Sequence, residues 1–429
     1  MSQSTAPVRT LIKAGRLLDV RNQKFLENQV LEIENGLIKR IVAAAAESGP
    51  RRASDKVIDL SRYTVLPGLI DCHTHLLQNY DFRNGFDDPN MILTLAQLTT
   101  AQRALLGARN AAEVLMAGIT TVRDLGNSGR GGDVALRNAI RDGWVKGPRM
   151  VVSTRAIAPI GGQLERTSLI GAGLIEEEYA IATGADEIRR AVRRAFFEGA
   201  DLIKVIVGYG PRMFTVAELK VIVEEAHSTG FGKKVAAHAI DETSIARAVE
   251  AGVDSIEHGY GLRSESLIKE MAKKRMFFFP TEEAPDDPTM KEIASRLRAM
   301  GERTEEAKDS PPKLAADTIH RLRRVLDSGV QVAFGSDAYY AVKGVSRGQA
   351  SLMTLRAYQA AGYTPWQIIR SATITAAELL GLEADIGSLE IGKAADMVAV
   401  QGDVLADVGL LEKLQFVMKH GEIILFSEP

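Results

Sequence analysis

The segment Pro67-Gly-Leu-Ile-Asp-Cys-His-Thr-His75 is an apolar run that ends in two histidines. Alternate side chains of a β-strand point to the same face, so His73 and His75 are expected on one side. Two imidazoles at this spacing can bind one metal ion. The alternative is a chance pair of histidines, although the chain has only 7 histidines in 429 residues. The segment therefore indicates a strand that ends in a metal site.

Seven further apolar runs follow, and amphipathic stretches rich in alanine, glutamate and arginine separate several of them. This alternation is typical of βα units around a parallel sheet. Eight such units close a (β/α)8 barrel. We therefore predict the α/β class and a TIM barrel, with strands at 64–75, 120–125, 150–154, 202–207, 234–238, 255–258, 276–280 and 331–336.

Both ends of the chain show weak helical periodicity and consist of short β-like pieces. Neither end alone offers enough strands to bury a face. We therefore predict one small β-sandwich lobe built from both ends. Its first part is expected at 1–66, the barrel at 67–385 and its second part at 386–429.

Three more polar residues stand at the ends of predicted strands, namely His238, His258 and Asp337. The carboxyl ends of barrel strands converge on the active site, so these side chains are expected near the first two histidines. The remaining histidines fall in predicted helices or in the terminal lobe. Surface or packing roles are expected for them: His227, His320 and His420.

Lys204 lies inside the fourth predicted strand, in Leu202-Ile-Lys-Val-Ile206. An ammonium group would repel cations there. Burial and nearby positive charge lower the pKa of a lysine, and the neutral amine can add carbon dioxide. The resulting carbamate is an anion with two oxygens that can bridge two metal ions. The alternative is that Lys204 is an ordinary salt-bridge partner.

At these positions the chain resembles the amidohydrolase superfamily along nearly its full length. Within this superfamily the chain resembles the two-metal branch, and in its details it resembles the imidazolonepropionase-related group. That group includes Xaa-Pro and Xaa-Arg dipeptidases and amidohydrolases that cleave ochratoxin A. The matching segments are Pro67–His75, Gly118-Ile-Thr-Thr-Val-Arg-Asp124, the strand residues Lys204, His238 and His258, Gly335-Ser-Asp337, and the tail from Ile386 to Val398.

The resemblance implies two divalent metal ions and assigns their ligands by position. His73, His75 and Asp337 would hold the first ion, His238 and His258 the second, and a carboxylated Lys204 both. Zinc is the expected ion, because imidazole and carboxylate donors suit it, with manganese and cobalt as alternatives. Two cations that share a water molecule lower its pKa toward neutrality. Asp337 is then expected to take the proton and pass it to the leaving nitrogen.

Three loop residues are candidates for contact with a small-molecule amide substrate. Arg212 could bind a substrate carboxylate, and Tyr209 could donate to the carbonyl or the oxyanion. Gln163 occupies a position where several relatives have histidine, which leaves the recognition of the carboxylate open. For Arg212 the alternative is an ordinary surface charge.

The composition excludes several classes of partner. The net charge is −2, with 53 basic and 55 acidic residues, and no long block of one sign offers a surface for nucleic acid or membrane. Cys72 is the single cysteine, so an internal disulfide and a thiolate metal site are excluded. The sequence shows no signal-type segment. We expect a cytoplasmic protein that forms a homo-oligomer.

Two other activities and a non-catalytic role remain open. A mononuclear deaminase of this fold would place glutamate three residues beyond the histidine of strand five, where this chain has Asp241, and would lack the bridging lysine. A hydrolase of ureas, carbamates or cyclic amides would use the same metal ligands with a different pocket. A barrel kept as a scaffold would not need the ligands.

Overall fold

The computed structural model of the chain describes residues 9–47, 54–79, 97–163, 171–228, 233–282, 311–340 and 344–427. The chain divides into two compact units, and each unit combines segments that are distant in the sequence. The first unit comprises Met1–Ile70, Val114–Thr121 and Thr364–Pro429, and the second comprises Asp71–Glu113 and Val122–Tyr363.

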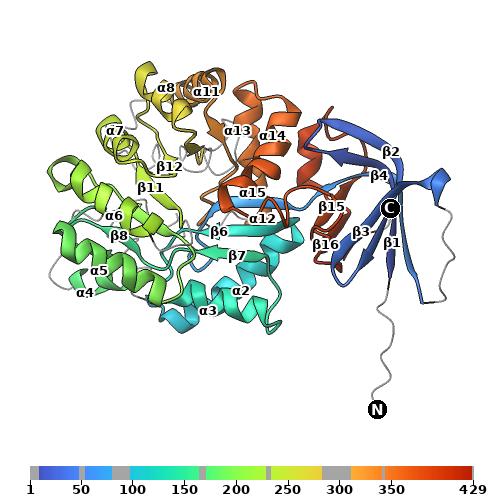
Figure 1. Ribbon diagram of the computed structural model, residues 1–429, viewed down its shortest axis with the longest axis horizontal. Helices are drawn as coiled ribbons and strands as arrows, with labels where there is room; N and C mark the ends of the chain where they lie inside the picture. The colour runs from blue at the N-terminus through green and yellow to red at the C-terminus, as the bar shows by residue number, and fades with distance from the viewer. Residues whose placement is uncertain are drawn as a thin grey trace, which may run out of the picture. The chain divides into compact units, whose positions relative to one another are not determined.

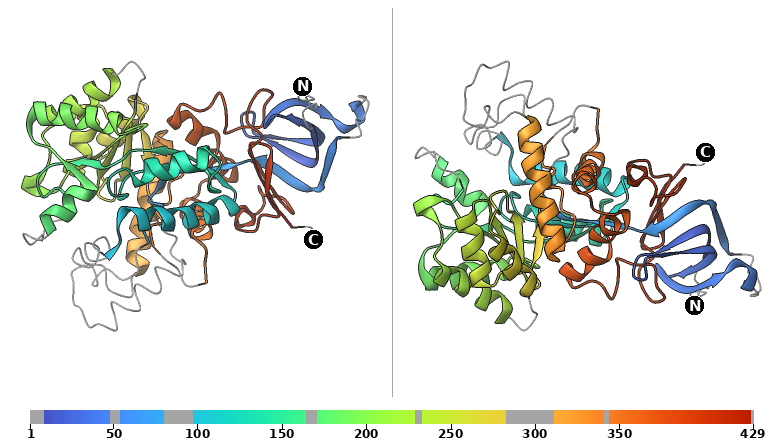
Figure 2. Two further views of the ribbon diagram at one scale, coloured as in Figure 1. Left: turned by 90° about the horizontal axis from the view of Figure 1, so that it is seen from below. Right: turned by 90° about the horizontal axis from the view of Figure 1, so that it is seen from above.

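The first unit contains a seven-stranded sheet made from both ends of the chain. In Figure 2 the N-terminal strands and the C-terminal strands lie side by side, as the strand order requires. β4 pairs with β1 on one side and with β15 on the other. The order is β17 (Glu422–Phe426), β16 (Phe416–Lys419), β15 (Met397–Val400), β4 (Lys56–Pro67), β1 (Thr10–Asp19), β2 (Lys24–Glu34) and β3 (Leu37–Ala43).

Apolar side chains from both ends of the chain share one core in this sheet. Ile12 and Leu31 come from the N-terminal strands, and Met397 and Phe416 come from the C-terminal strands; all four are fully buried. Neither end alone supplies this core. The predicted β-lobe built from both chain ends is thereby confirmed.

The barrel strands run parallel and follow the predicted order. They form two sheets, β5-β6-β7 and β14-β13-β12-β11-β10-β8-β9. The backbone N–H of Cys72 donates to the carbonyl of Phe334 at 2.8 Å, which brings the first and eighth strands together. The TIM barrel is confirmed. The bounds are β5 (Leu69–Thr74), β6 (Ile119–Asp124), β7 (Arg149–Val152), β8 (Ala156–Ala158), β9 (Tyr179–Ile181), β10 (Ile203–Ile206), β11 (Val235–Ala239), β12 (Ser255–His258), β13 (Phe277–Phe279) and β14 (Gln331–Val332).

The third predicted strand is bent. β7 and β8 are separated at Thr154, a non-glycine residue in the left-handed region with a φ of 60°. β8 then pairs with β10 and with the short strand β9, which the sequence pattern did not predict. The predicted run 150–154 corresponds to β7; the chain turns at the left-handed Thr154 and continues as β8, which lies beyond that run.

Helices lie outside the barrel strands, as Figure 1 shows for α5 to α8. The helices of the second unit are α2 (Thr100–Met116, which continues into the first unit), α3 (Gly132–Arg141), α4 (Gly171–Glu178), α5 (Gly184–Phe197), α6 (Val216–Ser228), α7 (Glu242–Ala251), α8 (Glu265–Lys273), α11 (Pro311–Ser328), α12 (Arg347–Met353) and α13 (Leu355–Ala360). The first unit adds α14 (Pro365–Ser371) and α15 (Ile374–Leu380). Short 3-10 turns stand at Ala44–Ala46 and Val408–Glu412 in the first unit and at Gly210–Arg212 in the second.

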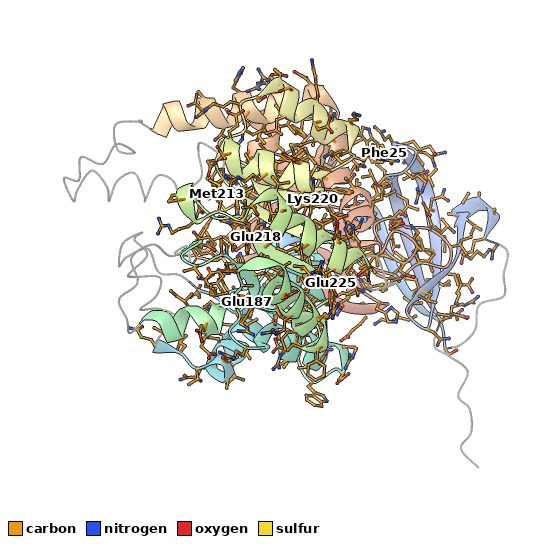
Figure 3. All side chains as sticks on the ribbon, turned by 60° about the vertical axis from the view of Figure 1, so that its left-hand side comes forward. Phe25, Glu187, Met213, Glu218, Lys220 and Glu225 are labelled. Atoms are coloured by element: carbon orange, nitrogen blue, oxygen red, sulfur yellow. The ribbon has the colours of Figure 1, made fainter. Side chains whose placement is uncertain are left out.

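Side chains on the outer surface join neighbouring helices. Glu225 of α6 accepts from Arg193 of α5 at 2.5 Å, and Glu218 of α6 accepts from the backbone N–H of Gly184 at 3.0 Å. Figure 3 shows these two glutamates on α6 beside α5. Exposed pairs of this kind contribute little to stability. The buried apolar stripe of α5, which includes Ile188 and Val192, supplies more of its attachment.

None of the described helices is both long enough and apolar enough to cross a lipid bilayer.

Gly335 allows the eighth strand to approach the first. A Cβ placed there would lie 2.8 Å from the Cβ of His73, closer than real contacts allow. We expect Gly335→Ala to lower the free energy of unfolding by about 1 to 3 kcal/mol, as overpacking does. Chemical denaturation measures this. Gly173→Ala is the matched control, because nothing lies within 4 Å of its added Cβ in α4, and no loss is expected. Equal losses in the two variants would contradict this account.

Candidate active site

The barrel brings the six predicted ligands to the carboxyl ends of its strands. His73 is near the end of β5 and His75 follows it, while Asp337 lies beyond β14. Five of the six line one cavity of about 210 Å³, and the sixth, His73, is in ring contact with His258, which lines it. The residues gathered here are His73, His75, Lys204, His238, His258 and Asp337.

One trio has the arrangement of a metal site. The ligand atoms of His73, His75 and Asp337 all lie within 4.8 Å of one another. Oδ1 of Asp337 lies 3.3 Å from Nε2 of His75 and 3.7 Å from Nε2 of His73. Nε2 of His73 is buried and has no hydrogen-bond partner among the described residues. A buried polar atom without a partner is unfavourable, and a divalent ion would satisfy it.

The other ring nitrogen of His75 is held by the backbone. Nδ1 lies 2.9 Å from the carbonyl oxygen of Gly126, which can only accept a hydrogen bond. The proton of a neutral ring therefore sits on Nδ1, and Nε2 presents its lone pair to the site. Partners of this kind fix the orientation of metal-binding histidines.

His238 and His258 form a second pair at the same rim. Their ring centroids are 4.5 Å apart, and the ring of His258 lies 4.9 Å from that of His73. Burial and the positive charge of Lys204 lower the pKa of His238 to about 3, so its ring is neutral. Neutral imidazole is the form that binds metals. The donor set therefore fits a second ion beside the first.

Hydroxyl groups contact this second pair. The hydroxyl of Tyr209 lies 2.6 Å from Nε2 of His238, and the hydroxyl of Thr281 lies 2.9 Å from Nδ1 of His258. The predicted role of Tyr209 placed it over the substrate. In this structure its hydroxyl bonds to a predicted metal ligand and also lines the cavity.

Lys204 is almost completely buried in β10 and faces the cavity with both histidines of the second pair. Its Nζ has no hydrogen-bond partner among the residues that the structure describes. Burial lowers the pKa of Lys204 to about 8, although the nearby Glu257 and Asp337 oppose the shift. An unpaired buried ammonium is costly, so the neutral amine or a modified, metal-binding form suits this place better.

The backbone is unusual at two of the predicted ligands. His258 and Asp337 have φ values of 71° and 51°, in the left-handed region that non-glycine residues seldom adopt. Such conformations are unfavourable and concentrate at functional sites. His258 ends β12 and Asp337 follows β14, and both side chains line the cavity.

The three predicted substrate contacts lie in different places. Gln163 and Tyr209 line the cavity, and amide groups of Gln78 and Asn127 line it with them. Arg212 is not among the described residues that line it. It lies at the end of a short 3-10 turn and packs over Gly161.

Asp71 is a site residue that the sequence reasoning missed. Its Oδ1 accepts from the backbone N–H groups of His73 at 3.1 Å and of Ser336 at 3.0 Å. Its Oδ2 accepts from the hydroxyl of Ser336 at 2.6 Å. Asp71 thus joins the strand of the first two histidines to the segment before Asp337. The signal was present, since a carboxylate at this alternation shares the face of His73.

The remaining histidines are away from the cavity. His227 lies at the end of α6 and pairs with Asp254 at 2.8 Å on the surface, and His420 stands in the turn between β16 and β17. His320 lies in α11. None of the three lines the cavity described above.

A barrel that gathers four histidines, a lysine and an aspartate at its strand ends has the site of a metal-dependent hydrolase. The pattern of the Amidohydrolase family matches residues 64–425. The chain therefore belongs to this family, whose members generally use divalent metals, and it is a hydrolase that acts on carbon–nitrogen bonds.

Similar proteins agree with this assignment. Ochratoxinase from Aspergillus niger is 30% identical over 452 residues, which cover 98% of this chain and 87% of that protein. A crystal structure of a Xaa-Pro dipeptidase with bound methionine is 28% identical, with a TM-score of 0.80 over 97% of this chain and 99% of that one. The crystal structure of A. niger ochratoxinase is 26% identical, with a TM-score of 0.79 over 98% and 96% of the two chains.

Proposed function

We propose that the protein cleaves the amide bond of N-acyl amino acids or dipeptide-like molecules, including amides of the ochratoxin type. The observation that carries the proposal is the gathering of His73, His75 and Asp337 within 4.8 Å, beside a second histidine pair and a buried lysine. His73, His75 and Asp337 would hold one divalent ion, His238 and His258 a second, and carboxylated Lys204 both. We expect zinc, because the donors are imidazole and carboxylate.

When bound, the ions lower the pKa of a water molecule and polarise the scissile carbonyl. In this proposal Asp337 also transfers a proton, in addition to holding the first ion. Its carboxylate takes the proton from the attacking water and delivers it to the leaving nitrogen, so that an amine and a carboxylic acid are released. The exposed side of Asp337 faces the cavity, which is where the amide would lie.

The carbamate of Lys204 is supported by the surroundings of its amine. A neutral amine adds carbon dioxide and releases one proton, which leaves an anion with two oxygens on Nζ. Burial favours the neutral amine, and Nζ has no hydrogen-bond partner among the described residues. The carbamate would replace an unfavourable cation by the anion that two metal ions require.

The cavity wall supports an amide substrate with an apolar group. Leu125, Ile206 and Ile240 provide an apolar surface. Hydroxyls of four tyrosines and the amide of Gln163 provide polar groups around it; the tyrosines are Tyr179, Tyr209, Tyr260 and Tyr339. We propose that Gln163 and Tyr209 contact the scissile amide or its oxyanion, and that Arg212 at the turn after β10 binds the substrate carboxylate.

The proposal is tested with zinc- or cobalt-loaded protein and a panel of N-acyl amino acids, Xaa-Pro dipeptides and ochratoxin A. The expected products are an amine and a carboxylic acid in equal amounts. Release of ammonia from a ring would indicate a deaminase, and an amine with carbon dioxide would indicate a urea or carbamate hydrolase. Either result, with no cleavage of the amides, would overturn the proposed substrate class.

Removal of the metals is expected to abolish the activity. After dialysis against a chelator, the rate should fall to the background, and zinc should restore it at about two ions per chain. Elemental analysis and the hydrolysis rate, followed along one titration, measure this. Circular dichroism of the metal-free protein controls for unfolding. Full activity with less than about one ion per chain would contradict the two-metal assignment.

A further inference from the structure

A buried ion pair lies directly behind His73. Glu257 in β12 is completely buried, and Arg123 in β6 is 1% exposed. Nη2 of Arg123 donates to Oε1 and Oε2 of Glu257 at 2.8 and 3.0 Å. The hydroxyl of Ser255 also donates to Oε1, at 2.5 Å. A buried carboxylate with an arginine on both oxygens is ionised, because removing its charge would leave the arginine unpaired.

The second oxygen of this carboxylate reaches His73. Oε2 of Glu257 lies 2.8 Å from Nδ1 of the imidazole, and both side chains are fully buried. An ionised carboxylate can only accept, so Nδ1 must carry the proton. Nε2 is then the free lone pair, and it is the atom that faces Asp337. The position of Glu257 therefore determines which nitrogen His73 presents to the site.

The contacts of Arg123 hold it in place, and Arg123 in turn holds Glu257. Its Nε donates to the carbonyl of Cys72 at 2.5 Å, and its guanidinium stacks over the ring of Phe279 at 4.5 Å from the centroid. These contacts connect strands β5, β6, β12 and β13. A carboxylate fixed in this way can hold an imidazole within the small tolerance that a metal site demands.

His73 differs in this respect from the other predicted histidine ligands. The backbone carbonyl of Gly126 contacts His75, and hydroxyls of Tyr209 and Thr281 contact His238 and His258. Among the described contacts, Nδ1 of His73 is hydrogen-bonded to a carboxylate, whereas the carboxylate nearest to Nδ1 of His258, that of Asp337, lies 3.7 Å away. A carboxylate partner makes a histidine a stronger donor than a neutral partner does.

We propose that Glu257, held by Arg123, is a positioning residue that orients His73 and fixes its tautomer, and thereby makes the first metal site the tighter of the two. This rests on the proposed function, in which His73 is a ligand. Glu257 touches neither substrate nor ion in this account. It acts through the imidazole.

Zinc titration of metal-free protein in competition with a chelator tests the proposal. The unaltered protein should bind zinc in a tighter and a weaker step. Glu257→Gln should weaken the tighter step by about 10- to 100-fold, the usual loss when an outer partner of a metal ligand is changed. The weaker step should not change. Ser255→Ala is the matched control, because it removes a bond to Oε1 and leaves the bond from Oε2 to His73; neither step should move.

A second measurement follows the tautomer directly. In the metal-free protein with 15N-labelled histidine, the His73 signals, assigned by loss in His73→Ala, should show a proton on Nδ1. In Glu257→Gln they should show a mixture of tautomers. Equal zinc affinity and an unchanged tautomer in this variant would overturn the role of Glu257. If the unaltered protein itself bound no zinc, the proposed function would fail instead.

The buried charges make one control necessary. Glu257→Gln leaves the Arg123 cation without its partner, which can prevent folding. Thermal unfolding of the metal-free variant shows whether it folds. If it does not, Arg123→Met/Glu257→Gln removes both charges together and is tested in the same two ways. Its zinc affinity in the tighter step should show the same loss, and an unaltered affinity would overturn the proposal.

Discussion

Asp337→Asn is expected to lower kcat by about 10²- to 10⁴-fold, the usual contribution of a positioned acid–base group. The amide keeps the size of the side chain but cannot accept the proton from water. Asparagine also tolerates the left-handed backbone of this position, where φ is 51°, so little strain is added. Steady-state kinetics at saturating metal separates the lost proton transfer from weaker binding of the first ion.

Asp241→Asn is the matched control for this prediction. Asp241 begins α7, and its side chain accepts from the backbone N–H of Ser244 at 2.9 Å. Asparagine is an equally good N-cap, so stability should hold. Asp241 also stands where a deaminase of this fold would carry its proton-shuttling glutamate. If Asp241→Asn lost the hydrolysis rate and Asp337→Asn kept it, Asp337 would not be the residue that carries the proton.

The sequence was sufficient to predict the site residues that lie on regular strands, where side chains alternate between the two faces. His73 and His75 share a face because they are two residues apart, and the apolar run around Lys204 placed it in the fourth strand. The order of the strands could then be predicted, because in a (β/α)8 barrel each strand lies next to the one that follows it in the sequence. The lobe could be predicted because neither chain end had enough strands to bury a face.

Alternation fails where a strand ends, and the missed residue Glu257 shows why. Glu257 and His258 are neighbours, so a regular strand would send only one of them into the barrel. His258 has a φ of 71°, and this turn allows both side chains to reach the site. A single left-handed residue is not visible in a pattern of apolar and polar positions. The contact between Glu257 and His73 could therefore be found only from coordinates.

Loop residues were the other limit of the sequence. Arg212, in the 3-10 turn Gly210–Arg212 after β10, packs over Gly161 and is not among the described residues that line the cavity, so its contact with a substrate carboxylate stays a prediction. Tyr209, only three residues away, does line the cavity. Neighbours in a turn diverge because their φ and ψ angles differ, and a sequence without a repeating pattern does not specify these angles.

Lys204→Ala is expected to lower kcat/KM by about 10³-fold and to reduce zinc from about two ions per chain to about one. A bound metal ion provides several kcal/mol of transition-state stabilisation, and about 1.4 kcal/mol corresponds to a factor of ten. In the proposed function, loss of the carbamate would leave the second ion with only two neutral donors, His238 and His258. Elemental analysis and hydrolysis kinetics, both at fixed free zinc, measure the two effects.

Two further variants separate a bridging anion from a general effect of removing lysine. Lys234 stands just before β11 and is an exposed lysine that pairs with Asp254 at 3.0 Å, so Lys234→Ala should leave rate and zinc content unchanged. In Lys204→Ala, a short carboxylate such as acetate or propionate can occupy the space of the carbamate. It should restore part of the rate and the second ion together, because in the proposed function both would depend on an anion held at this place. A Lys204→Ala protein that keeps two ions and the full rate without added carboxylate would show that Lys204 does not bridge.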